Sequence, residues 1–293
     1  MKIGIIGLGH VGSTVAYTLL LEHLADELVL IDTNPDKQNA EILEMQDVAQ
    51  NLARNVRILP APVINNPLGN PDKKTLPEPD YALLADADFV IFSAADLSKF
   101  EMTDRLGELH ITSKIVEDVA PKLKHSGFAG VVLSISNPCD VIAQYLQKLT
   151  GFPASKVIGT GTLLDTNRLK NRTGRQDVLM VGEHGESQTA LNHVTDHLAQ
   201  QARLSGWNIF KVKRYTNFGI ASCTARILRA MLQNSGEELP VSTYDPQRDV
   251  YYSVFATLGR NGVVSRRCPE TTEQEQAELD RSIARIKDVY ATL

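Results

Sequence analysis

The sequence predicts an α/β fold in which a doubly wound parallel sheet is followed by a mixed α+β domain. From residue 1 to about 137, short runs rich in Val and Ile alternate with longer segments of helical periodicity, which is typical of βαβ units. The runs Asp88–Phe92 and Gly130–Ile135 are apolar almost throughout, which indicates strands covered on both faces. After residue 138 the alternation gives way to helices mixed with short strands. We therefore expect two domains, residues 1–137 and 138–293.

Each element of the first domain follows from its local sequence. Asn34 is a suitable N-cap, and Pro35 suits the first position of the helix that follows it. The other two helices show the apolar spacing of an amphipathic helix and cover Val11–His23 and Arg105–His125. The strands are short, apolar and bounded by turn residues, and we expect them at Lys2–Gly7, Leu28–Asp32, Val56–Leu59, Asp88–Ser93 and Gly130–Ser136.

Three further segments have a recognisable local signal. Pro60–Pro79 holds six of the 13 prolines, so we expect a surface excursion with little regular structure. Asn261-Gly262 predicts a hairpin with a type I′ turn. Thr272 and Glu275 form a capping box that begins an amphipathic helix ending near Ala291.

Composition limits the classes of function. The chain has 293 residues, of which 43% are hydrophobic and 22% charged, as in ordinary globular proteins. Its net charge of −5 and the lack of a basic block argue against nucleic acid or an anionic membrane as partners. The three cysteines are widely spaced and include no C-x-x-C pair, which favours a reducing compartment. No apolar run approaches the roughly 18 residues that a membrane span needs, and we expect a cytoplasmic protein.

A glycine fingerprint follows the first predicted strand. Gly7, Gly9 and Gly12 form G-x-G-x-x-G, with His10 and Val11 between the second and third glycines. The pattern opens a predicted helix, and Asp32 ends the next strand 20 residues after Gly12. Such a loop lets the backbone approach a pyrophosphate at a helix N-terminus. A structural glycine turn is the alternative, but strand, helix and spacing together favour dinucleotide binding.

The residue at the end of the second strand indicates which dinucleotide is bound. The Asp32 carboxylate can accept both hydroxyls of the adenosine ribose and would repel a 2′-phosphate. Thr33 and Asn34, which follow, provide no arginine to attract that phosphate. NAD is therefore favoured over NADP.

Three polar groups lie where we expect the carboxyl ends of strands. Ser136-Asn137-Pro138 closes the fifth strand, although Asn-Pro is also a common turn. Asp165 and Arg168 are three residues apart, so they share a helix face, as they also would in a surface ion pair. His184 lies between Gly182 and Gly185, but a single histidine is more often structural or solvated. None of the three is decisive alone.

Together these motifs resemble the NAD-dependent L-lactate/malate dehydrogenase family. The resemblance rests on the glycine fingerprint with Asp32, Ser136-Asn137-Pro138, Leu164-Asp165-Thr166-Asn167-Arg168, Gly182-Glu183-His184-Gly185 and Tyr215-Thr216, in this order. Within the family the chain most resembles the L-2-hydroxyisocaproate dehydrogenase branch, through segments such as Gly159–Thr166. The resemblance covers nearly the whole chain and implies a Rossmann domain that binds NAD, followed by a substrate domain.

The resemblance also implies roles for individual residues. His184 is similar to the acid–base catalyst, and Asp165 to the carboxylate that orients it. Arg168 is similar to the anchor for the substrate carboxylate, and Arg105 to the arginine that polarises the carbonyl when a loop closes. Asn137 and Thr216 would line the substrate and nicotinamide sites. Further cofactor contacts are implied for His10, Val11, Ser93, Ala94, Ala95 and Ser136.

The chain departs from the family pattern in three places. Ala95 stands where the family usually has glycine in the Ser/Thr-Ala-Gly motif. Lys99 falls at the specificity position six residues before Arg105, where malate enzymes have Arg, whereas Phe100 or Met102 would favour an apolar substrate. The segments 169–181 and 190–215 have fewer residues than the corresponding segments of the family.

These observations lead to a main expectation and three alternatives. We expect an NAD-dependent L-2-hydroxyacid dehydrogenase of the L-lactate or L-2-hydroxyisocaproate type, which transfers hydride reversibly between NADH and a 2-oxo acid. The preferred substrate would have an apolar side chain of medium size, and the protein would form a homodimer or homotetramer. Malate dehydrogenase is the alternative within the family. An NAD- and metal-dependent glycosidase, with Cys139 near the site, and a non-catalytic NAD-binding protein are the alternatives from other classes. We expect no metal site.

Overall fold

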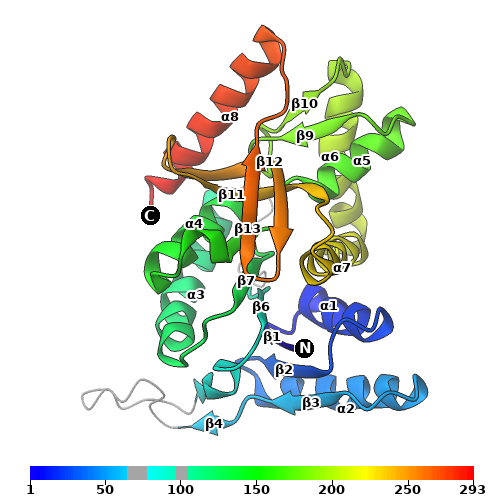
Figure 1. Ribbon diagram of the computed structural model, residues 1–293, viewed down its shortest axis with the longest axis vertical. Helices are drawn as coiled ribbons and strands as arrows, with labels where there is room; N and C mark the ends of the chain where they lie inside the picture. Colours follow the sequence, from blue (N-terminus) through cyan, green and yellow to red (C-terminus); the bar gives the residue numbers. More distant parts are fainter. Residues whose placement is uncertain (65–77, 97–104) are drawn as a thin grey trace.

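The computed structural model describes residues 1–64, 78–96 and 105–293, with the side chains of residues 105 and 106 excepted. It confirms the predicted α/β class. A nine-stranded sheet runs through the molecule with helices on both faces (Figure 1), in the order β13-β12-β11-β8-β7-β6-β1-β2-β3.

Six strands of this sheet are parallel and have the order of a dinucleotide-binding domain. They are β1 (Lys2–Ile6), β2 (Glu27–Ile31), β3 (Arg57–Pro60), β6 (Phe89–Phe92), β7 (Val131–Ser134) and β8 (Val157–Gly159). The parallel pairing thus continues through β8, beyond residue 137 where the sequence places the domain boundary. The division into two domains at that residue stays a prediction.

Three antiparallel strands extend the same sheet from β8. They are β11 (Glu238–Asp245), β12 (Val250–Gly259) and β13 (Gly262–Arg267). The predicted hairpin joins β12 to β13, but its turn is not of type I′, because within residues 260–262 only Gly262 has a positive φ, of +108°. A type I′ turn needs a positive φ at Asn261 as well, so this part of the prediction was wrong.

Two small sheets lie outside the main one. β9 (Leu179–Val181) pairs with β10 (Thr189–Leu191), and β4 (Val63–Ile64) pairs with β5 (Glu78–Pro79). The second pair closes the base of the proline-rich excursion, a regular pairing that its composition did not indicate. Residues 65–77 of that excursion lie outside the described residues.

Eight helices of the described chain cover the sheet. The predicted N-cap of α2 is observed, since Asn34 Oδ1 accepts the amides of Asp36 and Lys37, and the capping box of α8 is also complete. The helices are α1 (His10–Leu21), α2 (Pro35–Asn51), α3 (Arg105–His125), α4 (Cys139–Thr150), α5 (Leu163–Thr173), α6 (Asp196–Lys213), α7 (Phe218–Gln233) and α8 (Glu273–Tyr290). No helix in the described ranges is long and apolar enough to cross a membrane.

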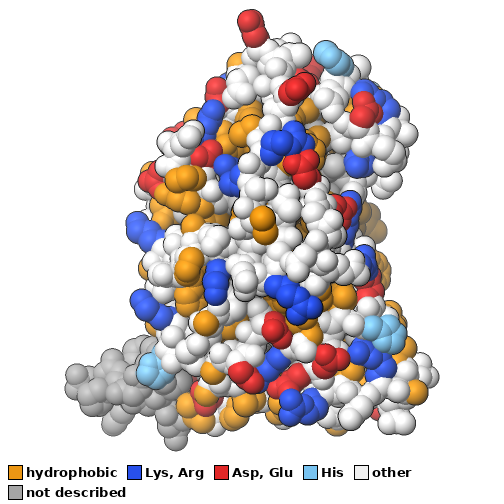
Figure 2. All heavy atoms as spheres, viewed as in Figure 1, with side chains coloured by type: hydrophobic (Ala, Val, Ile, Leu, Met, Phe, Trp, Pro, Cys, Tyr) orange, Lys and Arg blue, Asp and Glu red, His pale blue; other side chains and the backbone are white. Residues whose placement is uncertain are grey.

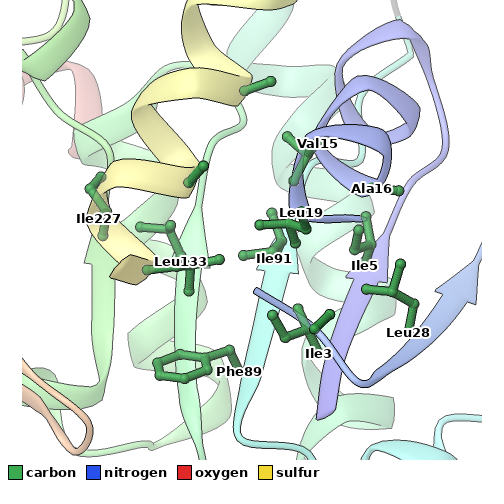
Figure 3. Close-up of a cluster of buried hydrophobic side chains, with 14 of the residues drawn as sticks. Ile3, Ile5, Val15, Ala16, Leu19, Leu28, Phe89, Ile91, Leu133 and Ile227 are labelled. Carbon is green, nitrogen blue, oxygen red and sulfur yellow. The ribbon is translucent and has the colours of Figure 1, made fainter. Parts of the chain in front are cut away.

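Two apolar cores explain why the central strands are apolar at consecutive positions. Phe89 and Ile91 of β6 belong to the core beneath α1, α2 and α7, whereas Val90 and Phe92 belong to the core beneath α3, α4 and α8. Figure 3 shows the first core, in which side chains of β1, β6 and β7 lie against α1 and α7. This packing fixes the carboxyl ends of β1, β6 and β7 side by side.

Candidate active site

The glycine loop is folded tightly between β1 and α1. Gly7 has a φ of +93°, and its amide donates to the Ile31 carbonyl at 2.8 Å. A Cβ on Gly12 would overlap the Gly7 carbonyl oxygen and come within 2.6 Å of Ser93 Oγ. Gly9 is different, because a Cβ there would meet no atom within 4 Å. The fold therefore needs Gly7 and Gly12 to be glycine, while space is left open above Gly9.

Asp32 lies beside this loop, immediately after β2. Its Oδ2 accepts the Leu8 amide at 2.8 Å, and its Oδ1 accepts the Asn34 amide at 2.9 Å. Each carboxylate oxygen can accept a further hydrogen bond, so both remain available to ribose hydroxyls. This arrangement fits the adenosine end of NAD.

The ends of β6 and β7 complete this edge of the sheet. Ser93 Oγ donates to the Gly7 carbonyl at 2.6 Å, and Ser136 Oγ donates to the Ala94 carbonyl at 2.9 Å. The predicted cofactor residues Ser93, Ala94 and Ser136 therefore lie together over the glycine loop. Ala95, at the position where the family usually has glycine, is exposed.

We predict that the two glycine positions respond differently to alanine. Gly12→Ala should lower the free energy of unfolding by about 1–3 kcal/mol, because backbone must move to accept the methyl group. It should also weaken NADH binding. Gly9→Ala should leave the melting temperature unchanged, since Gly9 has an extended backbone with φ of −68° and ψ of −174°. It should still weaken NADH binding about tenfold. Thermal melts and NADH fluorescence titrations measure the two effects, and normal affinity in Gly9→Ala contradicts the predicted path of the pyrophosphate.

The predicted reacting groups meet around one buried carboxylate. Asp165 lies in the first turn of α5 and is only 2% exposed. Its Oδ2 lies 2.6 Å from His184 Nδ1, and its Oδ1 accepts a hydrogen bond from a guanidinium nitrogen of Arg168 at 3.0 Å. The second ring nitrogen of His184, Nε2, takes no part in this contact, so it is the ring atom that could exchange a proton. We call these three residues the Asp165 triad.

Electrostatics in the Asp165 triad favour a charged histidine. Burial alone would raise the pKa of Asp165, but His184 and Arg168 outweigh it and hold this pKa below its usual range. Burial alone would lower the pKa of His184, but the charge and hydrogen bond of Asp165 raise it above its ordinary value of 6.5. These interactions therefore stabilise the protonated form of His184, which suits a group that donates a proton and takes it back.

The loop that bears His184 is held from two sides. Gly182 has a φ of +85° and exchanges two backbone hydrogen bonds with Ser253 of β12, each 2.9 Å long. The next amide, that of Glu183, donates to Ser282 Oγ of α8 at 2.8 Å. A Cβ on Gly182 would overlap Ser282 Oγ, so glycine is required here both for its backbone conformation and for the close approach of α8.

Helix α6 approaches the Arg168 side chain through a glycine. A Cβ on Gly206 would lie 3.0–3.2 Å from the guanidinium group of Arg168, so alanine there would crowd this group. Beyond α6, Thr216 is partly buried, and Tyr215 stacks on His10 with ring centroids 3.8 Å apart. This stack brings the segment between α6 and α7 onto the start of α1, so Thr216 and the glycine loop belong to one region.

The structure places some of the remaining predicted site residues, whereas others lie outside its described part. Asn137 is exposed at the end of β7, and Val11 is partly buried against the first core. Arg105 begins α3, but its side chain lies outside the described part of the structure, as does the whole of Lys99. Gly206 and Ser282, which position the triad, were missed because nothing in their local sequence indicates a contact with residues far away in the chain.

The described residues do not bring three or more His, Cys, Asp or Glu side chains into an arrangement that could hold a metal ion. Cys139, which the glycosidase alternative invoked, is buried and its Sγ accepts the Gly161 amide at 3.3 Å. On the face of the molecule in Figure 2, Lys and Arg side chains are interspersed with Asp and Glu.

The chain is similar in sequence to known dehydrogenases. The family model described as "lactate/malate dehydrogenase, NAD binding domain" matches residues 1–66 and 65–159. The L-lactate dehydrogenase of Halalkalibacterium halodurans is 30% identical, over 100% of this chain and 97% of that protein. L-lactate dehydrogenase 1 of Bifidobacterium longum is 31% identical, over 98% and 96% of the two chains.

Among solved structures, the ligand-bound minor L-lactate dehydrogenase of Enterococcus mundtii superimposes with a TM-score of 0.87. The sequences are 27% identical, and the match covers 100% of this chain and 98% of the other. Similarity in sequence and in structure therefore extends across both halves of the chain, including the segments that carry Asp165, Arg168 and His184.

Proposed function

The chain belongs to the lactate/malate dehydrogenase family, and from this premise we propose that it is an NAD-dependent L-2-hydroxyacid dehydrogenase of the L-lactate dehydrogenase type. It reduces a 2-oxo acid to an L-2-hydroxy acid and catalyses the reverse reaction. The observation that carries this proposal is the Asp165 triad, in which one buried carboxylate bonds both an imidazole and a guanidinium.

The residues of the triad divide the work of this reaction. Arg168 has guanidinium nitrogens beyond the one that bonds Asp165, so it can bind the carboxylate of the substrate. His184 donates a proton from Nε2 to the ketone oxygen, and Asp165 stabilises the imidazolium before that transfer. The glycine loop and Asp32 would hold the cofactor, and the bound NADH or NAD⁺ would provide the hydride donor or acceptor for the substrate carbon. Arg105 is proposed to polarise the carbonyl and Asn137 to contact the nicotinamide ribose.

The raised pKa of His184 predicts opposite pH profiles for the two directions. Reduction needs the imidazolium, so its kcat/KM should be constant at low pH and fall as the pH rises through the His184 pKa, above 6.5. Oxidation needs the neutral ring, so its kcat/KM should rise through the same pKa. Initial rates from pH 5 to 10 in both directions provide the measurement, and two profiles with the same slope would contradict this role.

The substrate is proposed to have an apolar side chain of medium size, as in the hydroxyisocaproate branch. Phe100 and Met102 support this choice, whereas Lys99 favours a dicarboxylic acid and keeps malate dehydrogenase as the alternative. Membership of the family argues against the glycosidase and non-catalytic alternatives.

A substrate panel tests the proposal directly. NADH oxidation is followed at 340 nm with pyruvate, 2-oxoisocaproate, phenylpyruvate and oxaloacetate, and separately with NADPH. We expect the highest kcat/KM with 2-oxoisocaproate and little activity with NADPH. A preference for oxaloacetate would replace the proposal by the malate alternative. If NADH binds but none of the four is reduced, the proposed function is wrong.

Two properties of the whole protein follow from the same proposal. We propose a homodimer or homotetramer, supported by large apolar side chains exposed on α6 and α7, such as Val212 and Phe218. We also propose a cytoplasmic location, supported by three cysteines that are all free.

A further inference from the structure

A buried glutamine side chain lies between the ends of β2 and β3. Gln38 is near the start of α2 and is 2% exposed, whereas the other buried residues of this helix are apolar. Its Oε1 accepts the backbone amide of Asp32 at 3.0 Å, and its Nε2 donates to the backbone carbonyl of Ala61 at 3.1 Å. The side-chain amide of Gln38 therefore joins the residue that follows β2 to the residue that follows β3.

This side-chain amide takes the place of a backbone hydrogen bond between the two strands. β2 and β3 pair in parallel as far as Leu30 and Pro60, and the Ala61 amide still donates to the Leu30 carbonyl at 3.0 Å. In a continuing parallel ladder, the next bond would run from the Asp32 amide to the Ala61 carbonyl. Gln38 bonds both of these groups instead, so the ends of the two strands are held apart by the length of one amide group.

The Gln38 contact determines where Asp32 lies relative to β3. The carboxylate of Asp32 is fixed by the backbone amides of Leu8 and Asn34, which belong to the glycine loop and to the N-cap of α2. Only the bond to Gln38, among these three, ties Asp32 to the third strand. A hydrogen bond between a hydroxyl and a carboxylate oxygen spans only about 2.5–3.0 Å, so a displacement of Asp32 by about 1 Å would break its bond to a ribose hydroxyl.

We propose that Gln38 is a positioning residue for the cofactor: by replacing a ladder bond between β2 and β3, it sets where the Asp32 carboxylate meets the adenosine ribose. Gln38 is buried and acts through Asp32. The proposal rests on the placement of the ribose at Asp32, which is part of the function proposed above. The bridge between the two strands belongs to the protein itself and can be measured without cofactor.

The test removes the bridge and keeps a side chain of similar size. In Gln38→Leu, neither the Asp32 amide nor the Ala61 carbonyl has its partner. Fluorescence titrations compare NADH with an NADH analogue that lacks the 2′-hydroxyl of the adenosine ribose. We expect the natural sequence to bind NADH about tenfold more tightly than the analogue, and Gln38→Leu to reduce this ratio to about twofold or less. Gln46→Leu is the matched control and should keep the ratio, because Gln46 is exposed on the same helix.

Two measurements separate this role from a merely structural one. In an Asp32→Ala protein, Gln38→Leu should change NADH affinity by less than about twofold, because the carboxylate through which it acts has been removed. Amide hydrogen exchange at Asp32, measured without cofactor, should be faster in Gln38→Leu, since the amide has lost its acceptor. A folded Gln38→Leu protein that keeps the full ratio overturns the proposal, even if its affinity for NADH and for the analogue has fallen equally.

The same variants distinguish a failure of this proposal from a failure of the proposed function. The titrations need no 2-oxo acid, so a protein that binds NADH without reducing any substrate is tested in the same way. If Asp32→Ala keeps the ratio of the natural sequence, the ribose is not bound at Asp32, and this proposal is wrong together with that placement. If Asp32→Ala abolishes the ratio while Gln38→Leu keeps it, only the role of Gln38 is wrong.

A shorter amide provides a second variant if Gln38→Leu does not fold. In Gln38→Asn the side chain has one methylene fewer, so its amide can bond the Asp32 amide or the Ala61 carbonyl but not both. We expect the ratio of the two affinities to fall by about two- to threefold. An unchanged ratio in Gln38→Asn overturns the proposal.

Discussion

Replacing His184 by asparagine is expected to lower kcat for 2-oxo acid reduction by about 10³-fold or more, while NADH binding changes little. Asparagine cannot carry the proton that the ketone oxygen must receive, and loss of a general acid typically costs 10²–10⁴-fold. Removing the imidazole also removes a partner of the buried Asp165 carboxylate. The residues proposed to bind the cofactor lie on the glycine loop and at Asp32, so they keep their contacts.

The control for this variant is another histidine of the same half of the chain. His193 is exposed and has a φ of +55°, a conformation that asparagine adopts readily. His193→Asn should therefore retain full activity. Steady-state kinetics and NADH fluorescence titrations on both variants give the comparison, and a His184→Asn protein that keeps its kcat/KM would exclude this histidine as the proton donor.

Replacing Arg168 by lysine is expected to cost about 2–5 kcal/mol of transition-state binding, or roughly 30- to 5000-fold in kcat/KM. Lysine retains the positive charge but presents a single nitrogen. It cannot bond the Asp165 carboxylate and also offer a planar pair of N–H groups to the substrate carboxylate. Most of the effect should fall on KM for the 2-oxo acid.

Arg172 provides the matched control, one turn further along α5. It is exposed, and its guanidinium donates to Ser205 Oγ at 3.4 Å. Arg172→Lys should change kcat/KM by less than about twofold, because exposed polar pairs contribute little. Equal kinetics for the two lysine variants would mean that Arg168 is a structural ion pair with Asp165.

The sequence predicted features that depend on short-range spacing. The alternation of apolar runs identified the parallel sheet, and the i, i+3 spacing of Asp165 and Arg168 was sufficient to place them on one helix face. The type of the β12–β13 turn was predicted wrongly. A type I′ turn needs a positive φ at both Asn261 and Gly262, but only Gly262 has one.

Contacts between distant residues could not be predicted in the same way. The Asp140 carboxylate accepts the backbone amide of His184, which lies 44 residues later in the chain. Ser282 accepts the amide of Glu183, which lies 99 residues earlier. Each contact forms because the end or the face of a helix packs against the loop after β9. The local sequence of either partner does not indicate that these two segments pack together. The residues proposed to react were therefore visible in the sequence, whereas those that hold them in place were not.

The attachment of the His184 loop to α8 has a consequence for how the protein is made. Ser282, which accepts the Glu183 amide, and β12, which bonds Gly182, both follow the His184 loop in the chain and are synthesised after it. A ribosome has therefore completed the dinucleotide-binding strands long before the histidine is locked in place. A nascent chain released before α8 should bind cofactor without turning over substrate, so we expect activity only after α8 has been synthesised.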